Sequence, residues 1–533
     1  MSVIPEYKRM RAPRGHGESL IDPPWAELDR CVQDNGSRFR QFNGDVQGRD
    51  WQQLRREARQ ELVQAARRYT AEYRDVAEIA PLVDGPLLLA GHQPELFHAG
   101  VWFKNFALSS LGTRLGAVAV NLLIDNDVLH AASIRVPSRT AAGVHVETLA
   151  FDGVCEGVPY EERTIRDAAC FESFAERVVT ALGEGGAPPL IRSYWSLAVA
   201  ASRRTRNLGR CLAEARHRIE GQWRQRTLEL PLSVACTSSA FAWFTTHLLA
   251  HLPRLWEIYN TSLAEYRRAN RVRSRSHPVP DLASDGPWLE APFWLWTAAA
   301  PRRRRLFVRR RGAALELTDR ERCELSLPLS ADAQADDAVE QLRVCSARGI
   351  RLRPRALITT MYVRLMLADL FLHGIGGAKY DQLTDLIIRR FFGWEPPSFA
   401  TLSATALLFP DRTHELSDEL RRTRQVLREL RYCPERHAPP TSDVQQLAAE
   451  KRQWIEQSLP RGQRLARHRG IQRVNLALQP RVAEQVASVS QRCAWLSDEQ
   501  RRQTTLASRE FAFCLFSEAQ LRPLLLDLSQ QVP

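Results

Sequence analysis

The sequence has no long apolar run and no paired cysteine motif, and each absence excludes a class of protein. No stretch of about 18 apolar residues occurs, so we expect no membrane-spanning helix. The ten cysteines are scattered without a C-x-x-C pair, which argues against a zinc ribbon and a disulfide-rich scaffold. The first nine residues contain no apolar stretch typical of a secretory signal. Together these absences predict a cytoplasmic protein that does not associate with membranes.

Lysine is scarce as well. Lys8, Lys104, Lys379 and Lys451 are the four lysines among 74 basic residues, and arginine supplies the rest. The net charge of +13 predicts a basic surface that can attract nucleic acid or a phosphorylated small molecule. A compact ammonium group cannot be exchanged freely for a planar guanidinium group. We therefore expect a lysine that persists in such a chain to be needed as lysine.

The apolar pattern predicts an α/β protein of roughly three domains' length. Residues 86–90 and 117–124 have the pattern of buried strands, and residues 101–115 between them have the pattern of a helix. Strand, helix and strand in this order predict a β-α-β unit in a parallel sheet. Residues 306–308 and 314–317 predict a hairpin, and 353–392 return to an α/β pattern.

The region from 411 to 507 is expected to be helical. Leu416, Leu420, Leu427 and Leu430, with Thr423 in the remaining position, recur at alternating intervals of four and three residues, and a second apolar series begins at Val444. This spacing predicts that the first helix and the second form an antiparallel coiled-coil hairpin. The hairpin could mediate a homodimer, although pairing within one chain satisfies the same apolar residues.

The first motif that could carry chemistry occupies residues 91–105, after the first predicted strand and at the start of the next helix. Backbone N–H groups and the helix dipole favour phosphate at such a position. Glycines allow the backbone to approach a ligand closely, and the histidines and the lysine can donate hydrogen bonds to phosphate oxygens. The candidate residues are Gly91, His92, Gln93, His98, Gly100, Lys104 and Asn105.

The second motif is acidic and ends the next predicted strand. Asp125 and Asp127 are expected at the carboxyl end of a parallel strand, which faces the crevice where such sheets bind ligands. They could hold a ribose, an amine or a divalent cation. A polar turn with side-chain caps explains the same residues equally well. We predict no dedicated metal site, and whether a divalent metal takes part is left open.

The third motif is rich in glycine. His373, Gly374, Gly376 and Gly377 follow an apolar run, and we expect them to form a loop that precedes a helix over 382–392. Lys379 would lie at the end of this loop, where its ammonium group can reach a phosphate as a point charge. The spacing of a Walker A motif is absent.

With these motifs the chain resembles the bacillithiol biosynthesis cysteine-adding enzyme family, as a divergent branch. The corresponding stretches are 88–108, 118–136, 350–395 and 411–507. More distantly, His98-Ala99-Gly100-Val101 resembles the H-x-G-H signature of the HIGH superfamily of class I aminoacyl-tRNA synthetases and nucleotidylyltransferases, with Val101 replacing the last histidine. The resemblance implies a Rossmann-like parallel-sheet core with helical insertions and a C-terminal coiled-coil hairpin.

From the resemblance we expect the chain to be divided at these boundaries: 1–80 N-terminal helices, 81–235 first half of the core, 236–345 insertion, 346–410 second half, 411–510 coiled coil, and 511–533 a segment returning to the core. The resemblance also implies an enzyme of the ligase type that binds an adenine nucleotide, ATP or ADP. It would join an amino-acid-like donor, cysteine or another amino acid, to a small acceptor.

In that reaction His92, His98, Asp125, Asp127 and Lys379 are the candidate catalytic residues, and the other residues of the first and third motifs would bind the nucleotide. Two alternatives stay open. A tRNA- or nucleic-acid-binding protein on the same fold would account for the arginine-rich hairpin and the basic coiled coil. A non-catalytic nucleotide-binding interaction protein would keep the nucleotide site without a pocket for a second substrate.

Overall fold

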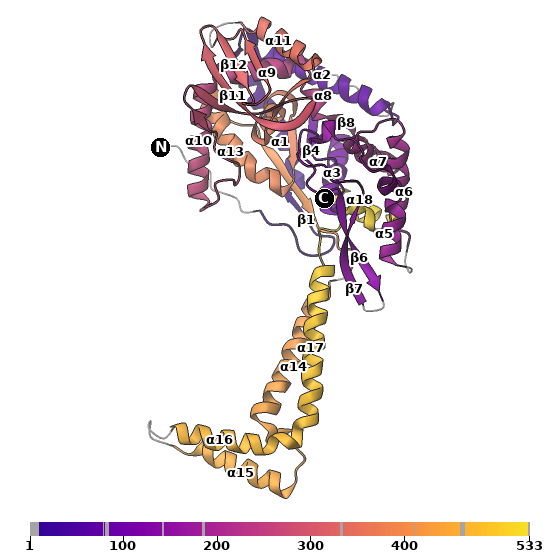
Figure 1. Cartoon of the computed structure of the whole chain (residues 1–533), viewed down its shortest axis with the longest axis vertical. Helices are drawn as coiled ribbons and strands as arrows, with labels where there is room; N and C mark the ends of the chain where they lie inside the picture. Colours follow the sequence, from indigo (N-terminus) through magenta and orange to yellow (C-terminus); the bar gives the residue numbers. More distant parts are fainter. Residues whose placement is uncertain are drawn as a thin grey trace. The chain divides into compact units, whose positions relative to one another are not determined.

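The computed structural model describes residues 10–77, 79, 85–140, 143–183, 187–330, 334–409, 411–458 and 464–530, with side chains for these residues except 139–144. The contacts divide the chain into two units (Figure 1). The first unit comprises residues 1–138, 147–406 and 509–533, and the second comprises 139–146 and 407–508. None of the helices in the described ranges combines the length and the apolar character that a bilayer crossing requires.

A six-stranded sheet forms the centre of the first unit. Its order is β1 (Ser19–Asp22), β16 (Phe399–Ala404), β15 (Leu370–His373), β4 (Leu87–His92), β5 (Val118–Leu123) and β8 (Leu228–Pro231). All neighbouring pairs are parallel except β1 and β16. Counted along the chain, the five parallel strands run 3-2-1-4-5 from β8 to β16. The α/β prediction and the predicted β-α-β unit are therefore confirmed.

Helices cover both faces of this sheet. Leu87 and Leu89 of β4 belong to a buried cluster with Leu62 of α2 (Trp51–Ala71). Side chains alternate along a strand, so Leu88 points to the opposite face. There α3 (Ala99–Leu115) packs on β4, β5, β15 and β16. The helix ends at Gly116, which has the left-handed conformation (φ 60°) that glycine adopts without strain.

The second sheet of this unit is antiparallel. Its order is β13 (Glu324–Leu327), β12 (Ala314–Thr318), β11 (Ala300–Arg311), β10 (Trp288–Thr297) and β14 (Ile350–Pro354), with β9 (Ser284–Asp285) beside β10. Val308 pairs with Leu317, which confirms the predicted hairpin. The two-stranded sheets are β2 (Asp45–Val46) with β3 (Arg49–Asp50) and β6 (Ser133–Thr140) with β7 (Gly143–Ala150).

The remaining helices of the first unit connect and surround these sheets. They are α1 (Leu28–Gln41), α4 (Ala168–Glu172), α5 (Phe174–Leu182), α6 (Ile191–Ser202), α7 (Leu208–Gln222), α8 (Leu232–Ala235), α9 (Ser239–Ala250), α10 (Leu252–Ala269), α11 (Asp336–Ala347), α12 (Ala356–Tyr362), α13 (Ile375–Phe392) and α18 (Glu518–Gln530). Helix α7 packs against α6, and α18 packs against α3.

The second unit contains α14 (Thr413–Tyr432), α15 (Ser442–Glu456), α16 (Arg464–Leu478) and α17 (Ala483–Leu506). Leu416 and Leu420 of α14 pack on Leu496 of α17, and α15 packs on α16 (Figure 1). The prediction that the first helix pairs along its length with the second is therefore wrong. Helix α17 has 24 residues and can follow all 20 residues of α14, whereas α15 has only 15.

We expect Leu496→Ala to destabilise this second unit by about 2–5 kcal/mol, the usual cost of a cavity at a buried leucine. Leu496 is fully buried against α14. Differential scanning calorimetry of the full chain should show a lower transition temperature for this second, helical unit than in the wild type. The control is Leu476→Ala on α16, where the leucine is 64% exposed and the change should be within about 0.5 kcal/mol. Equal transition temperatures of the second unit in the two variants would contradict this packing.

Candidate functional site

The three sequence motifs follow neighbouring strands at one edge of the parallel sheet. Ala90 of β4 lies opposite Leu372 of β15, and His92 lies opposite Leu123 of β5. All these strands are parallel, so their carboxyl ends lie at the same edge, where such sheets bind ligands. Two strand spacings separate β5 from β15, which is about 10 Å. The order of the strands reverses between β4 and β15.

At the first motif, the protein's own chain covers the N-terminus of α3. A Cβ atom on Gly100 would lie 1.9 Å from the backbone oxygen of Ala404, so only glycine fits there. His98 caps the helix, because its Nδ1 accepts a hydrogen bond from the Gly100 N–H group at 3.1 Å. The N–H group of Phe513 donates to the backbone oxygen of Phe97 at 3.0 Å. Close packing therefore accounts for Gly100, and capping of the helix accounts for His98, without a ligand.

The other residues of the first motif lie inside the protein. Lys104 is buried, and its Nζ donates to the backbone oxygen of Gly91 at 2.6 Å. The His92 imidazole lies between the backbone oxygen of Gln93 (3.0 Å) and Oδ1 of Asn105 (3.2 Å). A neutral imidazole can donate to only one of these two oxygens at a time. Burial, reinforced by nearby Arg216 and Lys104, holds the pKa of His92 well below its usual value.

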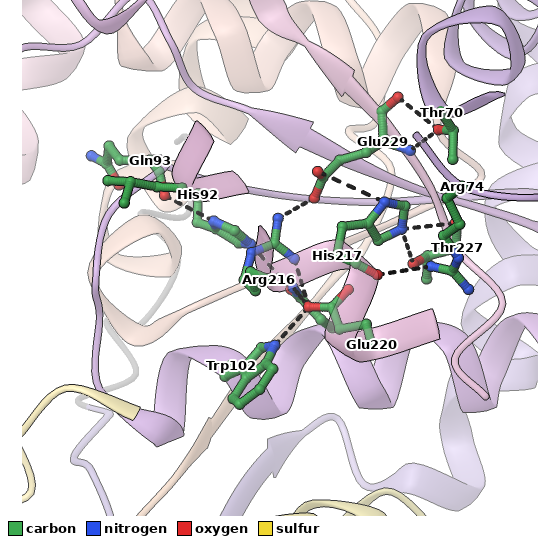
Figure 2. Close-up of polar contacts among 12 residues, drawn as sticks. Thr70, Arg74, His92, Gln93, Trp102, Arg216, His217, Glu220, Thr227 and Glu229 are labelled. Carbon is green, nitrogen blue, oxygen red and sulfur yellow. Dashed lines mark hydrogen bonds and ion pairs between the residues drawn. The ribbon is translucent and has the colours of Figure 1, made fainter. Parts of the chain in front are cut away.

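A buried cluster of ion pairs adjoins the residues of the first motif (Figure 2). The Arg216 guanidinium group of α7 forms ion pairs with Glu220, at 2.5 Å, and with Glu229 of β8. Glu220 also accepts hydrogen bonds from Trp102 (2.6 Å) and Asn105 (2.8 Å), both on α3. The cluster therefore connects α7, β8 and α3, and through Asn105 it reaches His92.

The cluster changes the pKa of the groups around it. Burial raises the pKa of Glu229 to about 7, although Arg216 opposes this. Burial and the positive charge of Arg216 lower the pKa of Lys104 to about 7. The Lys104 amine therefore loses its proton much more readily than an exposed lysine does. A neutral amine is compatible with its hydrogen bond to Gly91, which needs only a donor.

At the second motif, the two aspartates have different environments. Asp127 accepts hydrogen bonds from Gln93 (3.0 Å) and from Arg303 (2.8 Å). Asp125 is buried and binds both the N–H group of Ser233, at 2.8 Å, and its hydroxyl. Burial and the nearby Glu161 carboxylate raise the pKa of Asp125 to about 7. Within the described ranges, no three His, Cys, Asp or Glu side chains are grouped to hold a metal ion.

Asp125 lines a cavity of about 370 Å³, which we call the Asp125 cavity. It lies at the carboxyl ends of β5 and β8 and is closed on one side by α2. Its polar lining residues are Arg68, Tyr69, Glu72, Asp125, Glu161, Asn207, Arg210 and Ser233. Glu161 is paired with buried Arg353 at 2.8 Å. The cavity thus places an acid that titrates near neutral pH beside a second carboxylate and its arginine partner.

The third motif is helical where we predicted a loop. Helix α13 begins at Ile375, so Gly376, Gly377 and Lys379 lie in its first turns, and Gly374 is its N-cap residue. Gly374 lacks a side chain that could cap the helix, and Cβ atoms on Gly374 or Gly376 would meet open space. Lys379 is half-buried, and none of the described residues hydrogen-bonds its ammonium group.

His373 is held rigidly at the end of β15. Its Nε2 is 2.5 Å from Oδ2 of Asp381, which also binds Arg364 at 3.1 Å. Although burial alone would raise it, His373 and Arg364 hold the pKa of Asp381 well below its usual value. A Cβ atom on Gly377 would lie 2.5 Å from Nδ1 of His373, so this glycine makes room for the imidazole.

Sequence reasoning missed several residues at this edge. Glu161, Ser233, Arg210 and Arg353 line or support the Asp125 cavity but lie far from the motifs along the chain. One signal was available for Arg353. Arginines occupy every second position from 351 to 355, and such a row on one face of a strand needs acidic partners if it is buried. The sequence could not identify those partners, Glu162, Glu161 and Glu290.

We expect Lys104→Met to change how stability depends on pH. The pKa of Lys104 falls from its ordinary 10.5 to about 7 on folding, so the unfolded chain binds more protons between pH 7 and 10. The wild type should therefore gain up to about 1.4 kcal/mol per pH unit over the variant as the pH rises from 7. Urea unfolding at pH 7, 8 and 9 measures the difference. Phe103→Leu is a control whose effect should not vary with pH, and parallel curves for Lys104→Met would contradict the shift.

Comparisons with known proteins leave the family of this chain undefined. A scan against protein-family models finds no match, and a search of curated proteins finds none either. Any function proposed for this chain must therefore be argued from the geometry at the carboxyl ends of the parallel strands.

Proposed function

We propose that this chain is a nucleotide-binding enzyme of the ligase type that acts at the carboxyl edge of a Rossmann-like core. It would join an amino-acid-like donor to a small acceptor, as the resemblance to the cysteine-adding enzymes implies. The observation that carries the proposal is the Asp125 cavity at the edge of five parallel strands in the order 3-2-1-4-5. Ligands of such sheets bind at the carboxyl ends of the strands, and the cavity lies there beside β5 and β8, one strand away from the reversal between β4 and β15.

The N-terminus of α13 fits the phosphates of an adenine nucleotide better than that of α3. Both helices begin beside the reversal between β4 and β15, but the backbone of Ala404 lies against Gly100 at the start of α3. At α13 a Cβ atom on Gly374 or Gly376 would meet no other atom within 4 Å. Free N–H groups, the helix dipole and the Lys379 ammonium group would all favour an anion there.

The Asp125 cavity suits the amino group of the donor. Above pH 7 the Asp125 carboxylate is ionised and would attract an ammonium group. An amine must lose a proton before it can attack an acyl group, and a carboxylate whose pKa is about 7 is suited to accept that proton. Glu161, fixed by Arg353, would orient the donor from the other side. When bound, the nucleotide would supply the activated phosphate chemistry that drives the joining reaction.

The nucleotide site is tested by calorimetric titration with ADP and ATP. Lys379→Arg should weaken binding by about 1–3 kcal/mol, because the wider guanidinium group replaces a charge-assisted hydrogen bond of the ammonium group. Gly376→Ala should also weaken binding, since its methyl group would enter the space before the helix, yet it should not destabilise the fold. Arg389→Lys, in the last turn of α13, is the matched control and should change nothing.

Two outcomes would count against the nucleotide site. Failure of the wild type to bind either nucleotide at millimolar concentration would remove the proposal itself. Equal affinities for wild type and both α13 variants would instead place the nucleotide elsewhere on the protein.

The donor site is tested by the pH dependence of cysteine or alanine binding. Affinity should fall about tenfold per pH unit below pH 7, because protonated Asp125 no longer attracts the ammonium group. Asp125→Asn should bind weakly, with little pH dependence between pH 5.5 and 7.5. Asp127→Asn is the control, because Arg303 and Gln93 already hold that carboxylate, and it should keep the wild-type pH profile. A flat wild-type profile would exclude Asp125 as the group that binds the amine.

A further inference from the structure

We propose that a second, larger cavity in the first unit binds a neutral and mostly apolar small molecule that carries one hydrogen-bonding group. This cavity has a volume of about 580 Å³ and lies among α8, α9, α11 and β14. We call it the Thr245 cavity. The inference goes beyond the proposed nucleotide and donor sites and does not depend on either of them.

Most of the wall is apolar. Phe241 and Ala242 of α9 form one side, Val339 and Leu342 of α11 form another, and Leu352 of β14 contributes to a third. A concave apolar surface of several hundred Å³ with a few polar groups is the usual form of a small-molecule site.

The charged residues that line the cavity already have partners. Glu161 is paired with Arg353 at 2.8 Å, and Glu162 is paired with Arg351 at 3.1 Å. Arg343 is paired with Glu340 at 3.0 Å. The charges on the wall are therefore largely neutralised by neighbouring side chains, which favours a ligand without a net charge.

The N-terminus of α9, which also borders the cavity, is occupied as well. The Ser238 hydroxyl accepts a hydrogen bond from the Phe241 N–H group at 3.1 Å. The N–H groups of Ser239 and Ala240 lie near the Glu61 carboxylate of α2, where they oppose the rise in its pKa caused by burial. A carboxylate beside the first amides of this helix disfavours a second anion there. A neutral ligand is consequently favoured over a nucleotide or an amino acid.

One polar group of the wall lacks a partner. Thr245 lines the cavity and is fully buried, and its Oγ1 hydroxyl forms no hydrogen bond with the described residues. Buried hydroxyl groups are nearly always hydrogen-bonded, so a ligand atom would supply the missing partner once the Thr245 side chain turns its hydroxyl toward the cavity. A single N–H, O–H or carbonyl group on an otherwise apolar molecule would satisfy it. The ligand class follows from this hydroxyl together with the paired charges.

The two cavities have a common wall. Glu161, Ser233 and Val234 line both the Thr245 cavity and the Asp125 cavity. A molecule in the Thr245 cavity would therefore lie next to the carboxyl edge of the parallel sheet.

N-Phenyl-1-naphthylamine is a suitable probe, because it is neutral, apolar and fluorescent in apolar surroundings and has a single N–H group. We expect saturable binding to the full-length wild type with a micromolar Kd. Leu342→Trp should weaken binding at least tenfold by filling the cavity. Val344→Trp is the matched control on the same helix, at an exposed residue that does not line the cavity, and should stay within twofold. Thr245→Val, which keeps the shape but removes the hydroxyl, should weaken binding about threefold to tenfold.

Three outcomes would overturn the proposal: no saturable binding to the wild type, equal effects of the two tryptophan variants, or full displacement of the probe by ADP. Ala242→Leu, which narrows the cavity from α9, replaces Leu342→Trp if thermal melting shows that the latter does not fold. Binding of ADP and binding of the probe are each also measured alone, so failure of probe binding leaves the nucleotide proposal untouched, and loss of ADP binding leaves this one untouched.

Discussion

The ion cluster of Arg216, Glu220 and Glu229 is the interaction on which the arrangement of the parallel sheet most depends. All three side chains are almost completely buried, and they come from α7 and β8. Removing one partner from such a cluster leaves an unpaired charge in the interior, which is far more costly than losing a surface ion pair. The cluster therefore fixes how α7 packs beside β8 and, through its hydrogen bonds to Trp102 and Asn105, how α3 lies on the sheet.

A second constraint is the close approach of two backbones at the edge of the sheet. The start of α3 lies so near Ala404 that no side chain fits at Gly100, while the start of α13 is open at Gly374 and Gly376. The glycines at the N-termini of these two helices, which follow neighbouring strands, thus have different structural roles. Gly100 of α3 serves packing between elements and Gly377 of α13 makes room for His373, whereas Gly374 and Gly376 have open space where a side chain would stand.

The few lysines of this arginine-rich chain have mainly structural environments. Lys104 donates to Gly91 in the interior, and Lys451 is buried in the second unit, where it binds Glu435 at 2.8 Å. A narrow ammonium group fits these buried positions better than a planar guanidinium group does. Of the described lysines, Lys379 alone has an ammonium group without a hydrogen-bonded partner among the described residues, and Lys8 lies outside them. The scarcity of lysine therefore indicates that the remaining lysines are constrained by their surroundings. It does not show whether the constraint is structural or functional.

The sequence by itself determined the local elements. Apolar runs bounded by glycine and aspartate predicted β4, α3 and β5, and the alternating residues around Arg311-Gly312 predicted the hairpin of β11 and β12. These features depend on periodicity and turn chemistry, which are properties of neighbouring residues. The sequence also placed Asp125 at the end of a strand.

Only the tertiary structure decided which distant residues meet. The partner of α14 proved to be α17 and not the next helix, because the choice rests on helix length and on apolar contacts some 80 residues apart along the chain. The pKa of Asp125 depends on Glu161, Ser233 and burial, and the Thr245 cavity exists only where α9, α11 and β14 meet. Burial and contacts between distant residues follow from packing, so no local pattern encodes them.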